Sequence, residues 1–144
     1  MRYLGIDFGL KRVGLAVTDP GGKMAFPLKT IHRTTRDKFF KDLLGVIDAQ
    51  DIQAIVLGLP CQKEGKSLTY RQVENFKNSL MRRTSLPIYT VNEALTSFQG
   101  EKILESQKVT RSRKKKNLDQ VAAVLILESF LRHEGKEPAE QNEY

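Results

Sequence analysis

The sequence has one cysteine, two histidines and no apolar run long enough to cross a membrane. A single cysteine, Cys61, excludes a disulfide within the chain and a metal site built on several thiols. The longest apolar stretches, such as Val121 to Leu127, fall far short of the roughly 18 to 20 residues of a membrane span. Asp7 interrupts the N-terminal segment where a signal peptide would be apolar. We therefore expect a soluble, cytoplasmic protein.

The length and composition are typical of one globular domain. A chain of 144 residues falls within the usual size of a single domain, about 100–200 residues. The last eleven residues, 134–144, contain four Glu and one Lys. We expect a single domain over residues 1–133, followed by an acidic and flexible tail over residues 134–144.

Positive charge is in excess and is unevenly distributed. The chain has 24 Lys and Arg against 17 Asp and Glu, a net charge of +7. The tail carries −3, which leaves +10 on residues 1–133. The densest basic segment contains Lys108, Arg111, Arg113, Lys114, Lys115 and Lys116. Such a segment favours a polyanion such as nucleic acid, although a solvated loop would have the same composition.

Hydrophobic periodicity predicts an α/β fold. Apolar runs predict strands over 3–8, 13–18, 25–32, 54–59 and 87–91, and helical spacing predicts helices over 35–50, 67–83, 95–106 and 117–133. Pro27 suggests that the third strand lies at an edge. We expect a mixed five-stranded sheet, with three antiparallel strands followed by parallel strands, flanked by helices on both faces.

Three acidic residues stand where apolar elements lead us to expect burial. Asp7 ends the first strand, Glu93 follows the last strand, and Asp119 has Ala123 and Ile126 on its side of the last helix. Each has an ordinary alternative: a turn hydrogen bond for Asp7, an exposed loop for Glu93 and the positive end of a helix for Asp119. Together they predict a carboxylate cluster at the carboxyl ends of the strands.

A carboxylate cluster without thiols suits hard cations. Mg²⁺ or Mn²⁺ is therefore favoured over zinc. Two such ions about 3.5–4 Å apart can activate water and stabilise the leaving oxygen in phosphodiester hydrolysis. The sequence predicts a two-metal site with Asp7, Glu93 and Asp119 as ligands.

The first hairpin is rich in glycine and positive charge. Gly9 and Gly14 could let a phosphate approach the backbone, with Lys11 and Arg12 adding charge, or Gly9 could serve only the turn. The same Asp-x-Gly hairpin opens ATPases of the actin-like fold. Those enzymes need a second related domain, for which 144 residues leave no room.

Four segments in order resemble one known family. They are residues 5–20, residues 56–60 with Gly65, residues 91–97 and residues 114–123. The sequence is similar to the YqgF/RuvX family, whose members are described as Holliday junction resolvases and as pre-16S rRNA nucleases. The resemblance implies a ribonuclease H-like fold and places the metal ligands of the family on Asp7, Glu93 and Asp119. It also implies processing of the 5′ end of precursor 16S rRNA as the leading activity.

The chain departs from the family pattern beside Glu93. Asn92 and Ala94 stand where the family usually has Asp and Arg, so an acid and a base next to the catalytic Glu are missing. This keeps a catalytically idle nucleic-acid-binding module as one alternative, and resolution of four-way DNA junctions as another. An end-processing enzyme could act as a monomer, whereas a resolvase that cuts two symmetric strands is expected to be a homodimer.

Overall fold

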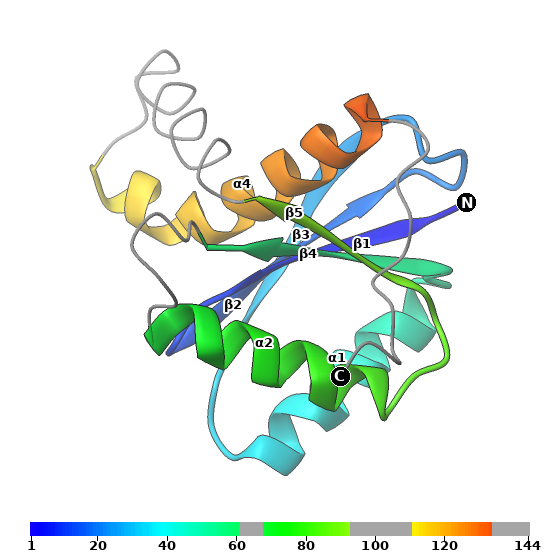
Figure 1. The fold of residues 1–144 in the computed structure, drawn as a ribbon. Coiled ribbons are helices and arrows are strands. Elements are labelled where there is room, and N and C mark those ends of the chain that lie inside the picture. Colours follow the sequence, from blue (N-terminus) through cyan, green and yellow to red (C-terminus); the bar gives the residue numbers. More distant parts are fainter. Residues whose placement is uncertain (61–67, 93–110, 134–144) are drawn as a thin grey trace.

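The computed structural model describes residues 1–60, 68–92 and 111–133, of which residues 68–69 and 111–117 are described by their backbone alone. These residues form one five-stranded sheet in the order β3-β2-β1-β4-β5, with helices on both faces (Figure 1). The elements are β1 (Tyr3–Phe8), β2 (Arg12–Thr18), β3 (Ala25–His32), α1 (Arg36–Ala49), β4 (Ala54–Leu59), α2 (Leu68–Met81), β5 (Ile88–Asn92) and α4 (Arg111–Arg132). The predicted helix over 95–106 and the predicted tail over 134–144 lie outside the described residues.

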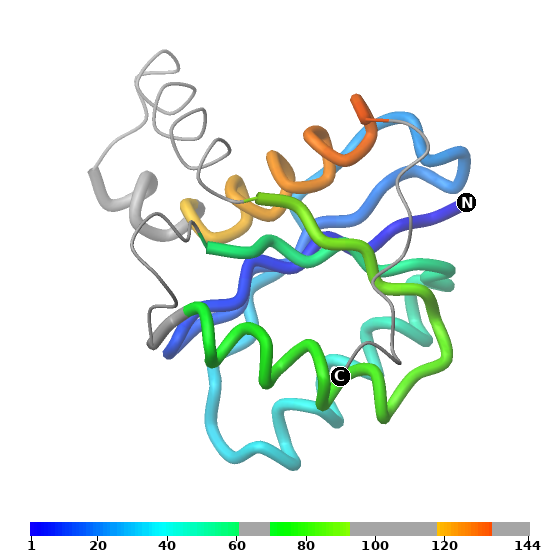
Figure 2. The backbone as a smooth tube through the Cα atoms, viewed as in Figure 1, coloured from blue at the N-terminus to red at the C-terminus, as the bar shows by residue number. Residues whose placement is uncertain are grey.

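The pairing of the strands confirms the predicted mixed sheet. β1 pairs antiparallel with β2, and β2 pairs antiparallel with β3. β1 also pairs parallel with β4, and β4 with β5. Figure 2 shows β4 running between β1 and β5, so segments far apart in the sequence share one sheet. Pro27 lies on β3 at the edge, beside a register shift, where a missing N–H is tolerated.

Alternation along the strands divides the core between the two faces. Leu4, Ile6 and Phe8 point to the face covered by α1 and α2 and belong to the larger apolar cluster. Ala16 of β2 and Val56 of β4, the strand partners of Gly5, point to the opposite face and pack with α4 in a second cluster. Asp7 therefore lies on the α4 face, between two residues that point to the other.

Helix α4 lies unusually close to β1 and β2, because glycines face it. A Cβ atom built on Gly5 would come within 2.5 Å of Leu127 Cγ and 2.8 Å of the Ala123 carbonyl oxygen. A Cβ atom on Gly14 would collide with the backbone of Asp119. Both contacts leave no room for a side chain, so the axis of α4 is fixed against the sheet at these two points.

Helix α4 begins earlier than the sequence predicts. Periodicity predicts a start at residue 117, but the helix begins at Arg111 and contains 22 residues. By composition the basic segment is typical of a loop before the helix, yet Arg and Lys are good helix formers, and the helix continues through them. Arg111 to Lys116 therefore form its first turns. No helix in the described ranges is long and apolar enough to cross a membrane.

The glycine contact with Asp119 makes a first testable prediction. Gly14→Ala should destabilise the protein by about 1–3 kcal/mol, because the added methyl group forces α4 away from β2. Chemical denaturation measures the change. Gly45→Ala on α1 is the matched control: a Cβ added there would meet nothing within 4 Å, so it should stabilise by up to about 1 kcal/mol. Equal effects of the two variants would contradict the packing.

The loop between β2 and β3 is organised by Asp19. Its carboxylate accepts hydrogen bonds from the backbone N–H groups of Gly21 (3.2 Å), Lys23 (2.8 Å) and Met24 (2.7 Å). These bonds, led by those from Met24 and Lys23, lower the pKa of Asp19 below its usual value. Gly22 takes the left-handed conformation that the turn requires, with φ 68°.

A lowered pKa in the folded state makes stability depend on pH. The charged Asp19 stabilises the fold above the pKa of the unfolded chain, about 3.9, and this contribution is lost as the pH falls through the folded value. Asp19→Asn should therefore be less stable than the parent protein at pH 7, and the difference should shrink below about pH 4. Thermal unfolding across pH measures this. Asp42→Asn, on the exposed side of α1, controls for loss of one negative charge.

Candidate metal and nucleic-acid site

Asp7 lies at the carboxyl end of β1, directly opposite Gly14 of β2. Paired residues of neighbouring strands project to the same face of a sheet. Gly14 faces α4, so the partly buried side chain of Asp7 projects toward α4 as well.

Asp119 reaches the same place from the helix. Its backbone lies against Gly14, the residue that pairs with Asp7. Ala123 and Leu127, one and two turns further along α4, are fully buried against the sheet. The residues of α4 that contact the glycines of the sheet thus extend from Leu127 back to Asp119. Asp7 and Asp119 have Gly14 as a common neighbour at one end of the sheet.

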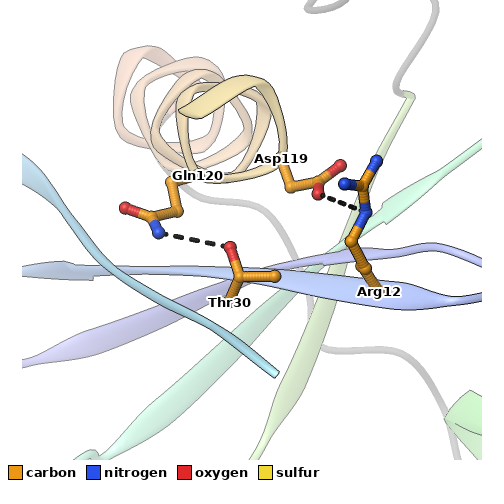
Figure 3. A network of polar contacts seen from close by, with 4 residues as sticks. All are labelled: Arg12, Thr30, Asp119 and Gln120. Atoms are coloured by element: carbon orange, nitrogen blue, oxygen red, sulfur yellow. Dashed lines mark hydrogen bonds and ion pairs between the residues drawn. The ribbon is translucent and has the colours of Figure 1, made fainter. Parts of the chain in front are cut away.

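Asp119 is ion-paired with Arg12. Arg12 Nε lies 3.3 Å from Asp119 Oδ2, and the two side chains are 49% and 22% exposed. The next residue, Gln120, donates a hydrogen bond to Thr30 Oγ1 of β3 at 3.2 Å. Figure 3 shows both contacts reaching down from α4 to neighbouring strands. The sequence indicates Arg12 by its charge, but gives no sign of this partner.

The turn between β1 and β2 is held from both sides. Gly9 N donates to the Arg12 carbonyl oxygen at 3.0 Å, and a Cβ on Gly9 would collide with that oxygen. Arg33 Nη1 donates to the carbonyl oxygens of Gly9 (3.3 Å) and Leu10 (3.0 Å). Gly9 therefore serves the turn.

The expectation that Gly14 admits a phosphate to the hairpin backbone is wrong. The space beside its Cα is filled by the backbone of Asp119. Lys11 and Arg12 remain at the turn as exposed cations, next to the end of β1 that carries Asp7.

Other predicted site residues lie partly or wholly outside the described residues. Glu93 is outside them, and it directly follows Asn92, the last residue of β5. The backbone of Arg111, Arg113, Lys114, Lys115 and Lys116 forms the first turns of α4. Within the described ranges, no group of three or more His, Cys, Asp or Glu side chains is close enough to hold a metal ion.

Comparison with known proteins assigns the chain to a family. Residues 1–133 match the family model described as "RuvX: Holliday junction resolvase". This chain belongs to the RuvX family. A relative from Nitratidesulfovibrio vulgaris (strain DP4), named "Putative pre-16S rRNA nuclease", is 51% identical over 132 residues, which cover 91% of this chain and 93% of the relative. The predicted family and the predicted hydrolase acting on phosphodiester bonds are confirmed.

Solved structures confirm the fold class. The structure titled "T. thermophilus RuvC in complex with Holliday junction substrate" has a TM-score of 0.65 at 15% identity, with 96% of this chain and 99% of that chain covered. A fowlpox virus resolvase in complex with Holliday junction DNA has a TM-score of 0.55 at 14% identity, with 94% and 100% covered. At these identities the similarity concerns the fold alone.

The ion pair predicts how the site responds to a cation. The Arg12 guanidinium and a metal ion would compete for the Asp119 carboxylate, and a partly exposed pair contributes about 0–1 kcal/mol. Arg12→Gln should therefore raise the affinity for Mn²⁺ by up to about fivefold, measured by calorimetric titration.

Lys11→Gln is the matched control, since it removes the neighbouring positive charge of the same exposed turn. Each variant removes one positive charge near the carboxylates, so the general electrostatic repulsion of Mn²⁺ should decrease in both. If both raise Mn²⁺ affinity equally, the ion pair does not compete with the metal.

Proposed function

We propose that this member of the RuvX family is a metal-dependent nuclease that processes the 5′ end of precursor 16S rRNA in the cytoplasm, with Asp7, Glu93 and Asp119 as metal ligands. The observation that carries the proposal is the contact of Asp119 with Gly14, the strand partner of Asp7. It places Asp119 beside the strand partner of Asp7, at the carboxyl end of a central strand, where ligand sites of α/β sheets occur.

The donor chemistry fits a hard divalent cation. Asp7 and Asp119 supply only oxygen ligands, as Mg²⁺ and Mn²⁺ prefer. A cation already accompanies Asp119 in the form of the Arg12 guanidinium. Glu93 follows the end of β5, and β5 runs parallel to β4, which runs parallel to β1. When bound, two ions would activate a water molecule and stabilise the leaving oxygen.

The protein residues would position the substrate around these carboxylates. Asp7 is held by the antiparallel ladder with β2, directly after the four residues of β1 that pair with β4, and Asp119 is held by the packing of α4. Arg12 and Lys11 stand at the adjacent turn, where their charges can hold the phosphates that flank the scissile bond. Arg12 would exchange its bond with Asp119 for a substrate phosphate, since guanidinium groups bind phosphate with two parallel hydrogen bonds.

The basic first turns of α4 support a polyanionic substrate. Five of the six residues from Arg111 to Lys116 are basic, and the helix has no acidic residue in its first turn. Positive side chains at a helix N-terminus oppose the helix dipole. Phosphates of a nucleic acid would neutralise the positive side chains and would interact favourably with the helix dipole. Asp119 follows Lys116 by three residues on the same helix. The proposed interface therefore delivers its ligand to the acids.

Two alternative functions have specific support. The family description names a Holliday junction resolvase, which would require two copies of the site in a homodimer, whereas rRNA end processing suits a monomer. Asn92 and Ala94, which replace the Asp and Arg of the family pattern, favour an idle binding module. The curated relatives are named for rRNA, and this favours RNA as the substrate.

Cleavage assays test the proposal directly. The protein should cut precursor 16S rRNA near its 5′ end only when Mg²⁺ or Mn²⁺ is present, and more efficiently than a four-way DNA junction. Asp7→Asn should reduce the rate at least about 100-fold while leaving binding intact, because one central ligand is lost.

Asp48→Asn, an exposed carboxylate on α1, is the control and should keep full activity. Preferential cutting of the junction by a dimer would assign the resolvase function instead. Tight binding without cleavage of either substrate would assign the idle module.

A further inference from the structure

Three arginines surround a cavity on the face of the sheet opposite to Asp7 and Asp119. Between α1, α2 and the segment that follows β3 there is a cavity of about 650 Å³. Phe8, Phe39 and Phe76 line its base, and Arg33, Arg36 and Arg82 stand around it. We call this cavity with its three arginines the arginine groove. Its volume is within the range of ligand pockets, about 300–1,000 Å³.

The aromatic base of the arginine groove is already occupied by its own contacts. The rings of Phe8 and Phe76 are stacked with centroids 4.4 Å apart, and Phe39 lies 5.8 Å from Phe76. All three side chains are buried. The Arg33 guanidinium covers Phe8 at 4.6 Å from the ring centroid. A ligand would therefore meet the polar lining of the groove, in which Arg36 and Arg82 supply positive charge, rather than the faces of these rings.

Two of the arginines converge on one neutral oxygen. Arg36 Nη2 and Arg82 Nη2 donate to Ser79 Oγ, at 2.6 Å and 3.1 Å. Ser79 is buried, and its hydroxyl offers two lone pairs, which these two donors use. The two guanidinium groups are brought together against their mutual repulsion, and within the described ranges Ser79 Oγ is the acceptor that both of them contact. None of the described residues that line the groove is a carboxylate.

The arginine groove begins beside the end of the sheet that carries the two carboxylates. Phe8 directly follows Asp7 on β1, and Arg33 donates to the turn that precedes Arg12. Arg33 also directly follows His32, which pairs with Arg12 across β2 and β3. A strand that lies across Lys11 and Arg12 can thus continue around the turn to Arg33 and onward to Arg36 and Arg82.

We propose that the arginine groove binds phosphate groups of the same nucleic-acid strand that enters the active site, at positions away from the scissile bond. The groove adds affinity without reading sequence, because guanidinium contacts to phosphate carry no base information. This inference rests on the proposed nuclease function for its choice of ligand. Its test measures binding alone, so that the two can fail separately.

Binding of single-stranded RNA oligonucleotides of about four and about sixteen nucleotides tests the proposal, since these lengths span the site sizes of single-strand grooves. The measurement uses fluorescence anisotropy at several salt concentrations, in an Asp7→Asn background. Arg36→Gln with Arg82→Gln should weaken binding of the long RNA and reduce its salt slope by about 1.4, at about 0.7 for each lost phosphate contact. Binding of the short RNA should not change.

A matched double variant controls for net charge. Lys41→Gln with Arg71→Gln removes the same charge from exposed positions of α1 and α2 that do not line the groove. It should leave the salt slope unchanged, and equal losses in both double variants would overturn the proposal. If the groove double variant does not fold, Arg36→Gln alone should lower the slope by about 0.7. Arg36→Lys with Arg82→Lys should retain the parent slope.

A free nucleotide is the other source of the same phosphate chemistry. If guanosine diphosphate competes for the groove as well as the long RNA does, regardless of RNA length, the groove is a nucleotide site and the strand proposal is overturned. Loss of cleavage in every assay, with length-dependent binding retained, would reject the nuclease function and keep the groove. Normal cleavage with no difference between the double variants would do the reverse.

Discussion

The close packing of α4 on β1 and β2 is the constraint on which both the fold and the candidate site depend. Gly5 and Gly14 let the helix approach until its backbone and side chains touch the strand, and Ala123 and Leu127 fill the space that remains. A strand with a side chain at either glycine would displace the helix by the size of that side chain. Since Asp119 lies on the same helix face, such a shift would also separate it from Asp7. The apolar packing of this face of the sheet therefore also sets the position of Asp119 relative to the strand that carries Asp7.

Much of the architecture could be predicted from the sequence because hydrophobic periodicity is a local signal. The apolar run over 3–8 and the helical spacing along 35–50 predict β1 and α1. The observed helix begins after Thr35, whose side chain accepts a hydrogen bond from Lys38 N. The start of α4 could not be predicted in the same way, since a run of positive charge resembles a solvated loop by composition. The helical propensity of Arg and Lys, together with the packing of the later turns, outweighs the repulsion between the neighbouring positive charges. Local pattern fails here because the stabilising contacts lie several turns away.

The candidate site was predictable in its residue types and not in its contacts. Burying an unpaired carboxylate costs free energy, so Asp7 and Asp119 are candidate functional residues because they interrupt apolar elements. The partner of Asp119 depends on how β2 passes beneath α4, and no local pattern links Arg12 to a residue at the other end of the chain. Gly14 shows the same limit. A glycine can admit a phosphate or a helix, and only the tertiary structure distinguishes them.

Alternation along β1 gives the two faces of the sheet different electrostatic roles. Asp7 and Phe8 are neighbours in sequence, yet Asp7 lies on the face of the sheet covered by α4, whereas Phe8 lines the arginine groove on the other face. The turn at Gly9 and Leu10 joins these faces, and Arg33 holds it by two carbonyl oxygens. Carboxylates that bind metal ions repel phosphate until those ions arrive, whereas guanidinium groups attract phosphate in any state. If the proposed function is correct, a nucleic-acid strand first held by the cations around the turn would meet carboxylates that are already positioned. Its affinity then need not come from the groups proposed to perform the chemistry.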